Sequence, residues 1–161
     1  MQHILRAGGL KAMEVDHFDP RRKNDYIQDY QNLFLATRHC NGAKRDNWPT
    51  AKEDAEGYRF LNCCEERDYG VHLFEDPHTH KIKWTTRAGG YHAIHCDLDA
   101  PHLVEERRQR AELLHLLHET PVLAKQSPPE LLACLEKIRE QLKLMIPEIP
   151  APPKQATGLP D

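Results

Sequence analysis

The sequence predicts an α+β fold in which a strand–loop–strand–helix unit at residues 13–49 packs against a later sheet and two helices. Two short apolar runs, at 13–17 and 32–37, are typical of strands. The segment 39–47 is predicted to be a short helix that stops before Pro49, because the residue preceding a proline disfavours helical backbone angles. The polar residues between the two runs predict a connecting loop.

A hairpin pattern downstream predicts the small antiparallel sheet. Residues 70–74 form an apolar run, and residues 81–85 alternate between polar and apolar. Turn-forming residues at 76–80 separate these two segments. After Gly89-Gly90, residues 91–98 are predicted to form a third strand.

Apolar residues at helical spacing predict the two C-terminal helices. The first is expected to begin near Pro101, because proline suits the first turn of a helix. The second is expected to begin after Ser127, with Glu130 completing a capping box. The tail at 147–161 contains five prolines and few apolar residues, so we expect it to be disordered.

The length of 161 residues suits one globular domain. We expect that domain to cover 1–146, with the sheet and helices at 58–146 supporting the unit at 13–49. No apolar run approaches the roughly 20 residues that a bilayer requires, and the first residues lack the apolar centre of a secretory signal. These patterns predict a cytoplasmic protein without a membrane partner.

Charge and cysteine usage narrow the function less than the motifs do. The net charge of −3 gives no general indication of nucleic-acid binding. The five cysteines show no C-x-x-C pair, so the sequence predicts neither a zinc ribbon nor a redox motif. Cys63 and Cys64 are adjacent, and we expect them to be small buried thiols.

Residues of the strand–loop–strand–helix unit have the chemistry needed to hydrolyse a phosphodiester. Asp16 and His17 end the first strand, where successive side chains point to opposite faces. A carboxylate suits a hard cation, and a histidine can take a proton from water near neutral pH. Asn41, near the start of the helix, adds an amide oxygen, and Lys44 follows one turn later at a suitable position for a phosphate contact.

The runs VDHF at 15–18, NLFL at 32–35 and HCNGAK at 39–44 together resemble the HNH nucleases. The active site of that family is two short strands and a helix around one divalent metal, so the resemblance implies a ββα-metal core at 13–49. The runs RFLNCCEE at 59–66 and HLVEERR at 102–108 are similar to the downstream region of bacterial HNH proteins found in phage-defence operons.

The resemblance implies a role for each matching residue. His17 corresponds to the general base, and Asn32 to the residue that steadies the loop and orients the base. Asp16 and Asn41 correspond to the ligands of one Mg²⁺ or Mn²⁺ ion. Lys44 matches the lysine that ends the C-N-x-x-K run and is a candidate phosphate contact.

Three further residues are candidate contacts to the substrate. His39 is expected to pack beside the site or to meet DNA, with a role as metal ligand in place of Asn41 as the alternative. Arg21 and Arg22 lie in the basic part of the loop between the strands. Many HNH proteins also hold a structural zinc with two C-x-x-C pairs, but here Cys40 stands alone, so no structural zinc is expected.

The resemblance therefore implies a metal-dependent HNH endonuclease that hydrolyses DNA by a one-metal mechanism, with double-stranded DNA as the expected substrate. A role as the nuclease effector of an anti-phage system follows from the same resemblance, with a defence-system ATPase as a possible protein partner. A nickase or an RNase is a third alternative. The alternative class is a catalytically silent DNA-binding or partner-docking module with the same fold.

Several other polar residues have simpler explanations. His92, His95 and Cys96 suggest a second metal site, but on the predicted strand His95 opposes the other two. His78 and His80 are expected to be solvated in a turn. The arginines of the first C-terminal helix are expected to pair with its own glutamates rather than bind phosphate; they are Arg107, Arg108 and Arg110, with Glu105, Glu106 and Glu112.

Overall fold

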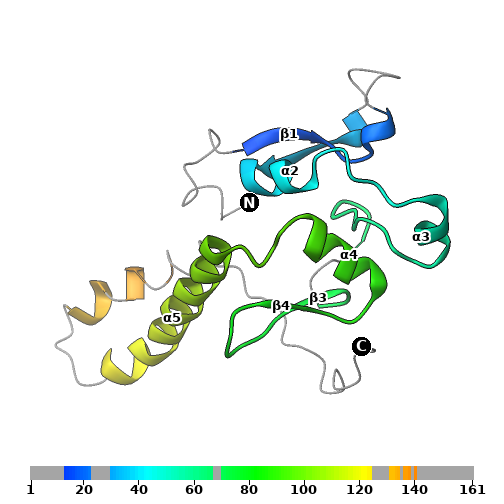
Figure 1. The fold of residues 1–161 in the computed structure, drawn as a ribbon. Coiled ribbons are helices and arrows are strands. Elements are labelled where there is room, and N and C mark those ends of the chain that lie inside the picture. Colours follow the sequence, from blue (N-terminus) through cyan, green and yellow to red (C-terminus); the bar gives the residue numbers. More distant parts are fainter. Residues whose placement is uncertain are drawn as a thin grey trace.

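The computed structural model describes residues 13–22, 30–66, 70–124, 131–134, 136–138 and 140. Within them, the chain mixes helices with two separate two-stranded antiparallel sheets, which confirms the predicted α+β class (Figure 1). The predicted helix start at Ser127 and the predicted tail lie outside the described residues. No helix in the described part of the chain is long and apolar enough to cross a membrane.

The first unit has the predicted order of strand, loop, strand and helix. Strand β1 (Met13–His17) pairs antiparallel with β2 (Leu33–Thr37), which places Asp16 opposite Phe34. The loop between them begins and ends in short 3₁₀ turns, η2 (Pro20–Arg22) and η3 (Tyr30–Asn32). Helix α2 (Arg38–Lys44) follows β2 directly and packs against both strands.

The caps of α2 explain its boundaries. The hydroxyl of Thr37 accepts a hydrogen bond from the backbone N–H of Cys40 at 3.3 Å, so the last residue of β2 also begins the helix. Arg45 adopts a positive φ of 49°, which ends the helix three residues before the predicted boundary. The close junction fixes where α2 lies relative to the hairpin.

A short helix that the sequence analysis did not assign, α3 (Ala51–Ala55), follows Pro49. Its N-terminus is a capping box: Glu53 N–H donates to the Thr50 hydroxyl, and the Glu53 carboxylate accepts from Thr50 N–H at 2.8 Å. The sequence signal for it, Thr-x-x-Glu after a proline, is present at residues 50–53.

The second sheet matches the predicted hairpin, but the segment that follows it does not match. Strands β3 (Leu73–Glu75) and β4 (Ile82–Trp84) pair antiparallel. The predicted third strand over 91–98 is wrong, because these residues lie mainly in helix α4 (Arg87–His95) and the turn after it.

Two local features explain why this segment is helical. Thr86 caps the helix by accepting a hydrogen bond from Gly89 N–H at 3.0 Å. Gly89 and Gly90 lie close to Trp84 of β4 and to the backbone of His72. A Cβ on Gly89 would lie 2.4 Å from the His72 carbonyl oxygen. A Cβ on Gly90 would lie 2.8 Å from Nε1 of Trp84. The glycine pair therefore permits helix–sheet contact instead of marking a turn.

Helix α5 (Pro101–Ala124) begins at the predicted proline and is anchored by two buried arginines. Arg107 donates to the carbonyl oxygens of His80 at 2.6 Å and Leu98 at 2.9 Å. Arg110 pairs with Glu75 on β3. These arginines therefore fasten α5 to the hairpin, which corrects the expectation that they pair within the helix. Arg108 does pair with Glu105 and Glu112, as predicted.

The turn of the hairpin also differs from expectation at one of its histidines. His78 is exposed, as predicted. His80 is partly buried, has a positive φ of 57°, and its Nδ1 lies 2.9 Å from a Glu75 carboxylate oxygen. The turn is thereby tied both to β3 and, through the His80 carbonyl, to α5.

Two buried apolar clusters form the core. One lies between the hairpin and α4 and is centred on Leu61, Leu73 and Ile82. The other joins α4 to the first unit through Phe60 and Tyr91, against which Phe18 and Trp48 pack. The two clusters share Leu98 at their border. The ββα unit, made of β1, β2 and α2, is thus packed against the hairpin–α4 unit, made of β3, β4 and α4.

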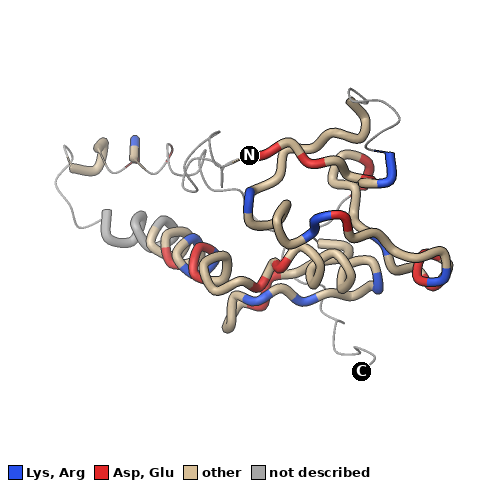
Figure 2. The backbone as a smooth tube through the Cα atoms, turned by 45° about the horizontal axis from the view of Figure 1, so that its top comes forward, with Lys and Arg blue, Asp and Glu red and all other residues tan. Residues whose placement is uncertain are grey.

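Charged residues of both signs are interspersed along the described chain (Figure 2). The cysteines are free thiols, and Cys63 and Cys64 are exposed, so the expectation that these two are buried is wrong. Cys96 is buried, and burial is the main reason that its pKa is raised to about 12.

Candidate functional site

The helix-facing side of β1 presents two carboxylates. Side chains of a strand alternate between faces, so Glu14 and Asp16 share one face. Both interact with side chains of α2, which packs on β1. Their partners on α2, Asn41 and Lys44, are three residues apart and therefore lie on the same side of the helix.

Asp16 forms a largely buried ion pair with Lys44. The ammonium nitrogen lies 2.9 Å from Oδ2 and 3.1 Å from Oδ1 of Asp16, and it also donates to the backbone carbonyl of His17 at 2.8 Å. The side chains are 6% exposed for Lys44 and 13% exposed for Asp16. Lys44 therefore neutralises the carboxylate in this structure, instead of extending into solvent as a free phosphate contact.

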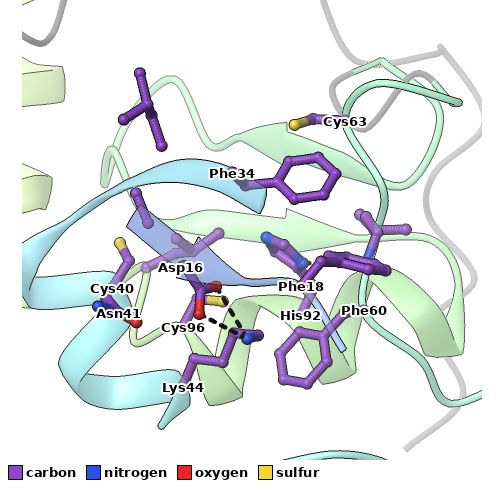
Figure 3. Close-up of a pocket in the computed structure, with 14 residues that line it drawn as sticks. Asp16, Phe18, Phe34, Cys40, Asn41, Lys44, Phe60, Cys63, His92 and Cys96 are labelled. Carbon is purple, nitrogen blue, oxygen red and sulfur yellow. Dashed lines mark hydrogen bonds and ion pairs between the residues drawn. The ribbon is translucent and has the colours of Figure 1, made fainter. Parts of the chain in front are cut away.

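Asn41 is held by Glu14. Its Nδ2 donates to Oε2 of Glu14 at 2.9 Å, while Oε1 of Glu14 accepts from Nε of Arg38 at 2.8 Å. The Arg38 and Asn41 hydrogen bonds, in that order of size, lower the pKa of Glu14. The amide oxygen of Asn41 lies on the side toward Asp16 (Figure 3).

Asp16, Asn41 and Lys44 line one cavity of about 190 Å³ between the ββα unit and α4 (Figure 3). Its walls are mainly apolar and include Phe34 of β2 and Phe60 of the second core cluster. The ammonium of Lys44 lies 5.5 Å from the centroid of the Phe60 ring, within cation–π range. The polar groups are thus concentrated at one end of an otherwise apolar space.

His17 lies at the end of β1 on the opposite face from Asp16, with Leu33 as its cross-strand partner. It does not line the cavity. Its Nε2 is buried and has no hydrogen-bond partner among the residues that the structure describes. A buried ring nitrogen without a partner is an uncommon feature in folded proteins and is often found at sites with a function.

Asn32 is buried at the end of η3, directly before β2, with 2% of its surface exposed. Its Oδ1 accepts from Asp19 N–H at 2.7 Å, and its Nδ2 donates to the Asp19 carbonyl at 3.0 Å. The backbone carbonyl of Asn32 also accepts from Phe18 N–H at 2.9 Å. Asn32 therefore closes the loop directly after His17, and its depth makes it a positioning residue rather than a substrate contact.

The candidate substrate contacts lie elsewhere on the surface. Nε2 of His39 lies 3.1 Å from a carboxylate oxygen of Asp97, and its ring packs edge-on against His102 at 4.5 Å. His39 is not among the residues that line the cavity. The structure thus places His39 beside the start of α5 rather than next to Asp16.

Arg21 and Arg22 lie in η2, at the entrance to the loop. Arg21 pairs with Asp19 at 2.8 Å, and its guanidinium lies 5.0 Å from the Trp48 ring centroid. The same Arg21 pairing is the largest cause of a lowered pKa of Asp19. Arg22 is exposed.

The second group of possible metal ligands lies on a helix and not on the predicted strand, so its side chains are arranged differently from the prediction. His92, His95 and Cys96 now lie at helical spacing on α4 and its C-cap. Nδ1 of His92 accepts from Leu61 N–H at 3.2 Å, and Cys96 is buried. The ring of His95 packs at a tilt against Tyr91, with the ring centroids 4.1 Å apart. These contacts assign His95 to packing, whereas His92 and Cys96 also line the cavity with Asp16.

Two oxygen donors at the cavity are of the kind that a hard divalent cation prefers, and a cation there would replace the Lys44 ammonium at Asp16. Asp16 supplies a carboxylate, and Asn41 supplies an amide oxygen whose partner nitrogen is already engaged by Glu14. Mg²⁺ and Mn²⁺ accept such oxygens and retain several waters. In the described ranges, no three or more His, Cys, Asp or Glu side chains are grouped so that they could hold a metal ion. A site made of one carboxylate and one amide is not a group of this kind.

Two residues of this site were missed in the sequence. Glu14 was overlooked, although the two-residue strand period places it beside Asp16. Phe60 has no local signal, because its place in the cavity wall depends on packing between the two units.

Comparison of the chain with protein-family models, curated proteins and solved structures finds no match. The proposed function therefore rests on the motif resemblance and on the geometry of the site.

Proposed function

We propose that this chain is a metal-dependent endonuclease of HNH type that hydrolyses DNA phosphodiester bonds. In this proposal β1, β2 and α2 form the ββα-metal core, and the hairpin, α4 and α5 support it. The observation that favours it most is that Asp16 from β1 and Asn41 from α2 line the same cavity as a pair of hard oxygen donors. His17 is adjacent to Asp16 and has a ring nitrogen without a partner among the described residues.

The roles of the residues follow from their chemistry. Asp16 and Asn41 would hold one Mg²⁺ or Mn²⁺, which when bound stabilises the charge that develops on the phosphate. His17 takes the proton of the attacking water as the general base, from the end of β1 beside the cavity lining. Asn32 fixes the loop that follows His17. Lys44 meets a phosphate once it is released from Asp16.

The expected substrate is double-stranded DNA, and the expected setting is the cytoplasm without a membrane partner. An anti-phage role with a defence-system ATPase as partner belongs to the same proposal. Arg21, Arg22 and His39 are the candidate contacts to the substrate outside the cavity.

The test is cleavage of supercoiled plasmid with Mg²⁺ or Mn²⁺ by wild type and by His17→Ala. Loss of the general base is expected to slow cleavage by at least about 100-fold. His78→Ala is the matched control, because His78 is an exposed histidine in the hairpin turn. Circular dichroism and a chelator control establish that the variants are folded and that cleavage requires metal.

A second candidate function is a catalytically silent DNA-binding or partner-docking module. The Asp16–Lys44 ion pair favours it, because it neutralises a carboxylate that a metal would need. If wild type and His17→Ala bind DNA equally and neither cuts nor nicks it, the nuclease proposal is wrong and the silent module stands. Relaxed circular product alone would indicate nicking, and cleavage of RNA alone would change the substrate class.

A further inference from the structure

We propose that Glu14 is a positioning residue whose carboxylate fixes which end of the Asn41 amide faces the candidate metal site. This inference rests on the proposed function, because it concerns the same site. Glu14 lies outside the runs of residues that resemble the HNH motif.

The contacts around Glu14 use each of its oxygens once. Oε2 accepts from Asn41 Nδ2 at 2.9 Å, and Oε1 accepts from Arg38 Nε at 2.8 Å. Arg38 and Asn41 are separated by one turn of α2, so their side chains reach the same carboxylate. Glu14 is thereby held in one orientation across the interface between β1 and α2.

The chemistry of the two groups determines the orientation of the amide. An ionised carboxylate can only accept hydrogen bonds, whereas an amide has one end that donates and one that accepts. The NH₂ group of Asn41 must therefore face Glu14, and the carbonyl oxygen must face the other way. That direction is toward Asp16 (Figure 3). Rotating the amide by half a turn would bring two oxygens together and lose the hydrogen bond.

The orientation matters because a hard cation binds the amide oxygen and not the NH₂ group. Glu14 would thus keep Asn41 ready to bind the metal without touching the metal itself. Outer partners of this kind typically change metal affinity by about 10- to 100-fold when they are removed.

Two simpler roles for Glu14 must be separated from positioning. One is a surface ion pair with Arg38, whose side chain is 86% exposed and whose contribution would be small. The other is general attraction of a cation by the negative charge of Glu14. The second role would act whether or not Asn41 is present.

The experiment measures Mn²⁺ affinity by electron paramagnetic resonance for wild type, Glu14→Gln, Asn41→Ala and the double variant. Glu14→Gln is expected to weaken binding by about 10- to 100-fold, because Arg38 donates to the glutamine oxygen and leaves the glutamine NH₂ group facing Asn41, where it favours the reversed amide. In the Asn41→Ala background the same change is expected to have no further effect. Equal weakening in both backgrounds would overturn the inference in favour of simple charge attraction.

Arg38→Gln is the matched control. It removes the exposed ion pair and leaves the Glu14–Asn41 hydrogen bond in place, so affinity is expected to change by less than about fivefold. An effect of Arg38→Gln as large as that of Glu14→Gln would assign the effect to the ion pair and overturn the inference.

A second readout needs no metal. The side-chain NH₂ resonances of Asn41, assigned in ¹⁵N-labelled protein, are expected to shift in Glu14→Gln and to stay in place in Arg38→Gln. Unchanged resonances in Glu14→Gln would overturn the positioning role even if the nuclease proposal holds. If wild type neither binds Mn²⁺ nor cleaves DNA, the nuclease proposal fails, while the resonances still decide whether Glu14 orients the amide.

Discussion

At the scale of single residues, Asn32 joins the end of the loop, directly before β2, to the residues that follow β1. Both ends of its amide bond the backbone of Asp19, at 2.7 and 3.0 Å, in a buried position. A buried amide whose oxygen and nitrogen both form hydrogen bonds is tolerated in the core. Replacing its donor with an acceptor would leave two acceptors facing each other.

We expect Asn32→Asp to destabilise the fold by ~2 kcal/mol or more, because it places a carboxylate oxygen against the Asp19 carbonyl in a buried site. The free energy of unfolding, from urea denaturation, measures this change. Asn47→Asp makes the same replacement at an exposed position and is expected to change stability by less than ~0.5 kcal/mol. Equal effects of the two variants would contradict a special role for the Asn32 contacts.

Some of the candidate site follows from local sequence, and some does not. The strand period and the short α2 place Asp16 and Asn41 correctly on neighbouring elements. The Asp16–Lys44 ion pair was not predicted, because its geometry depends on how α2 packs across the hairpin. The position of His39 beside Asp97 depends on a contact between residues far apart in the chain.

At the scale of elements, α4 shows why one prediction failed. Glycines weaken isolated helices, so Gly89-Gly90 favoured a break followed by a strand. In the folded chain the same glycines let the helix lie against Trp84 and the His72 backbone. Packing outweighs the low helix propensity here, and a local pattern contains no information about that packing.

Gly89→Ala is expected to destabilise the protein by ~1–3 kcal/mol, because its Cβ would lie 2.4 Å from a backbone carbonyl oxygen that cannot move freely. Gly42→Ala is the matched control in α2, where an added Cβ would have nothing within 4 Å. That variant is expected to gain ~0.5–1 kcal/mol from helix propensity alone. Thermal melting of the two variants measures both effects, and stabilisation by Gly89→Ala would contradict the close packing.

At the scale of the whole molecule, the ββα unit and the hairpin–α4 unit share a border at the cavity. The order of the ββα unit and the β3–β4 hairpin was predictable, since turn residues and alternation are local signals, whereas α4 was not. The docking of α5 through Arg107 and Arg110 was not, because buried arginines at helical spacing look like an exposed charged stripe in the sequence. Their partners, the His80 carbonyl and Glu75, come from the hairpin.

The ammonium of Lys44 occupies the carboxylate that the proposed metal would bind. A divalent ion that binds Asp16 must displace this ammonium, which then loses its partner on β1. A DNA phosphate would supply a new partner, so metal and DNA are expected to bind with positive heterotropic coupling, typically ~1–3 kcal/mol. By reciprocity each ligand would strengthen the other equally.

Mn²⁺ affinity measured with and without a short DNA duplex, in a His17→Ala background that leaves the duplex intact, tests this coupling. Lys44→Met is expected to reduce the coupling, because no ammonium then moves between the two anions. Lys83→Met, an exposed lysine on β4, is expected to preserve it. If the coupling in Lys44→Met equals that of the parent, Lys44 does not transfer between the carboxylate and the phosphate. If it is reduced, the ion pair that neutralises Asp16 also makes metal uptake responsive to the presence of DNA.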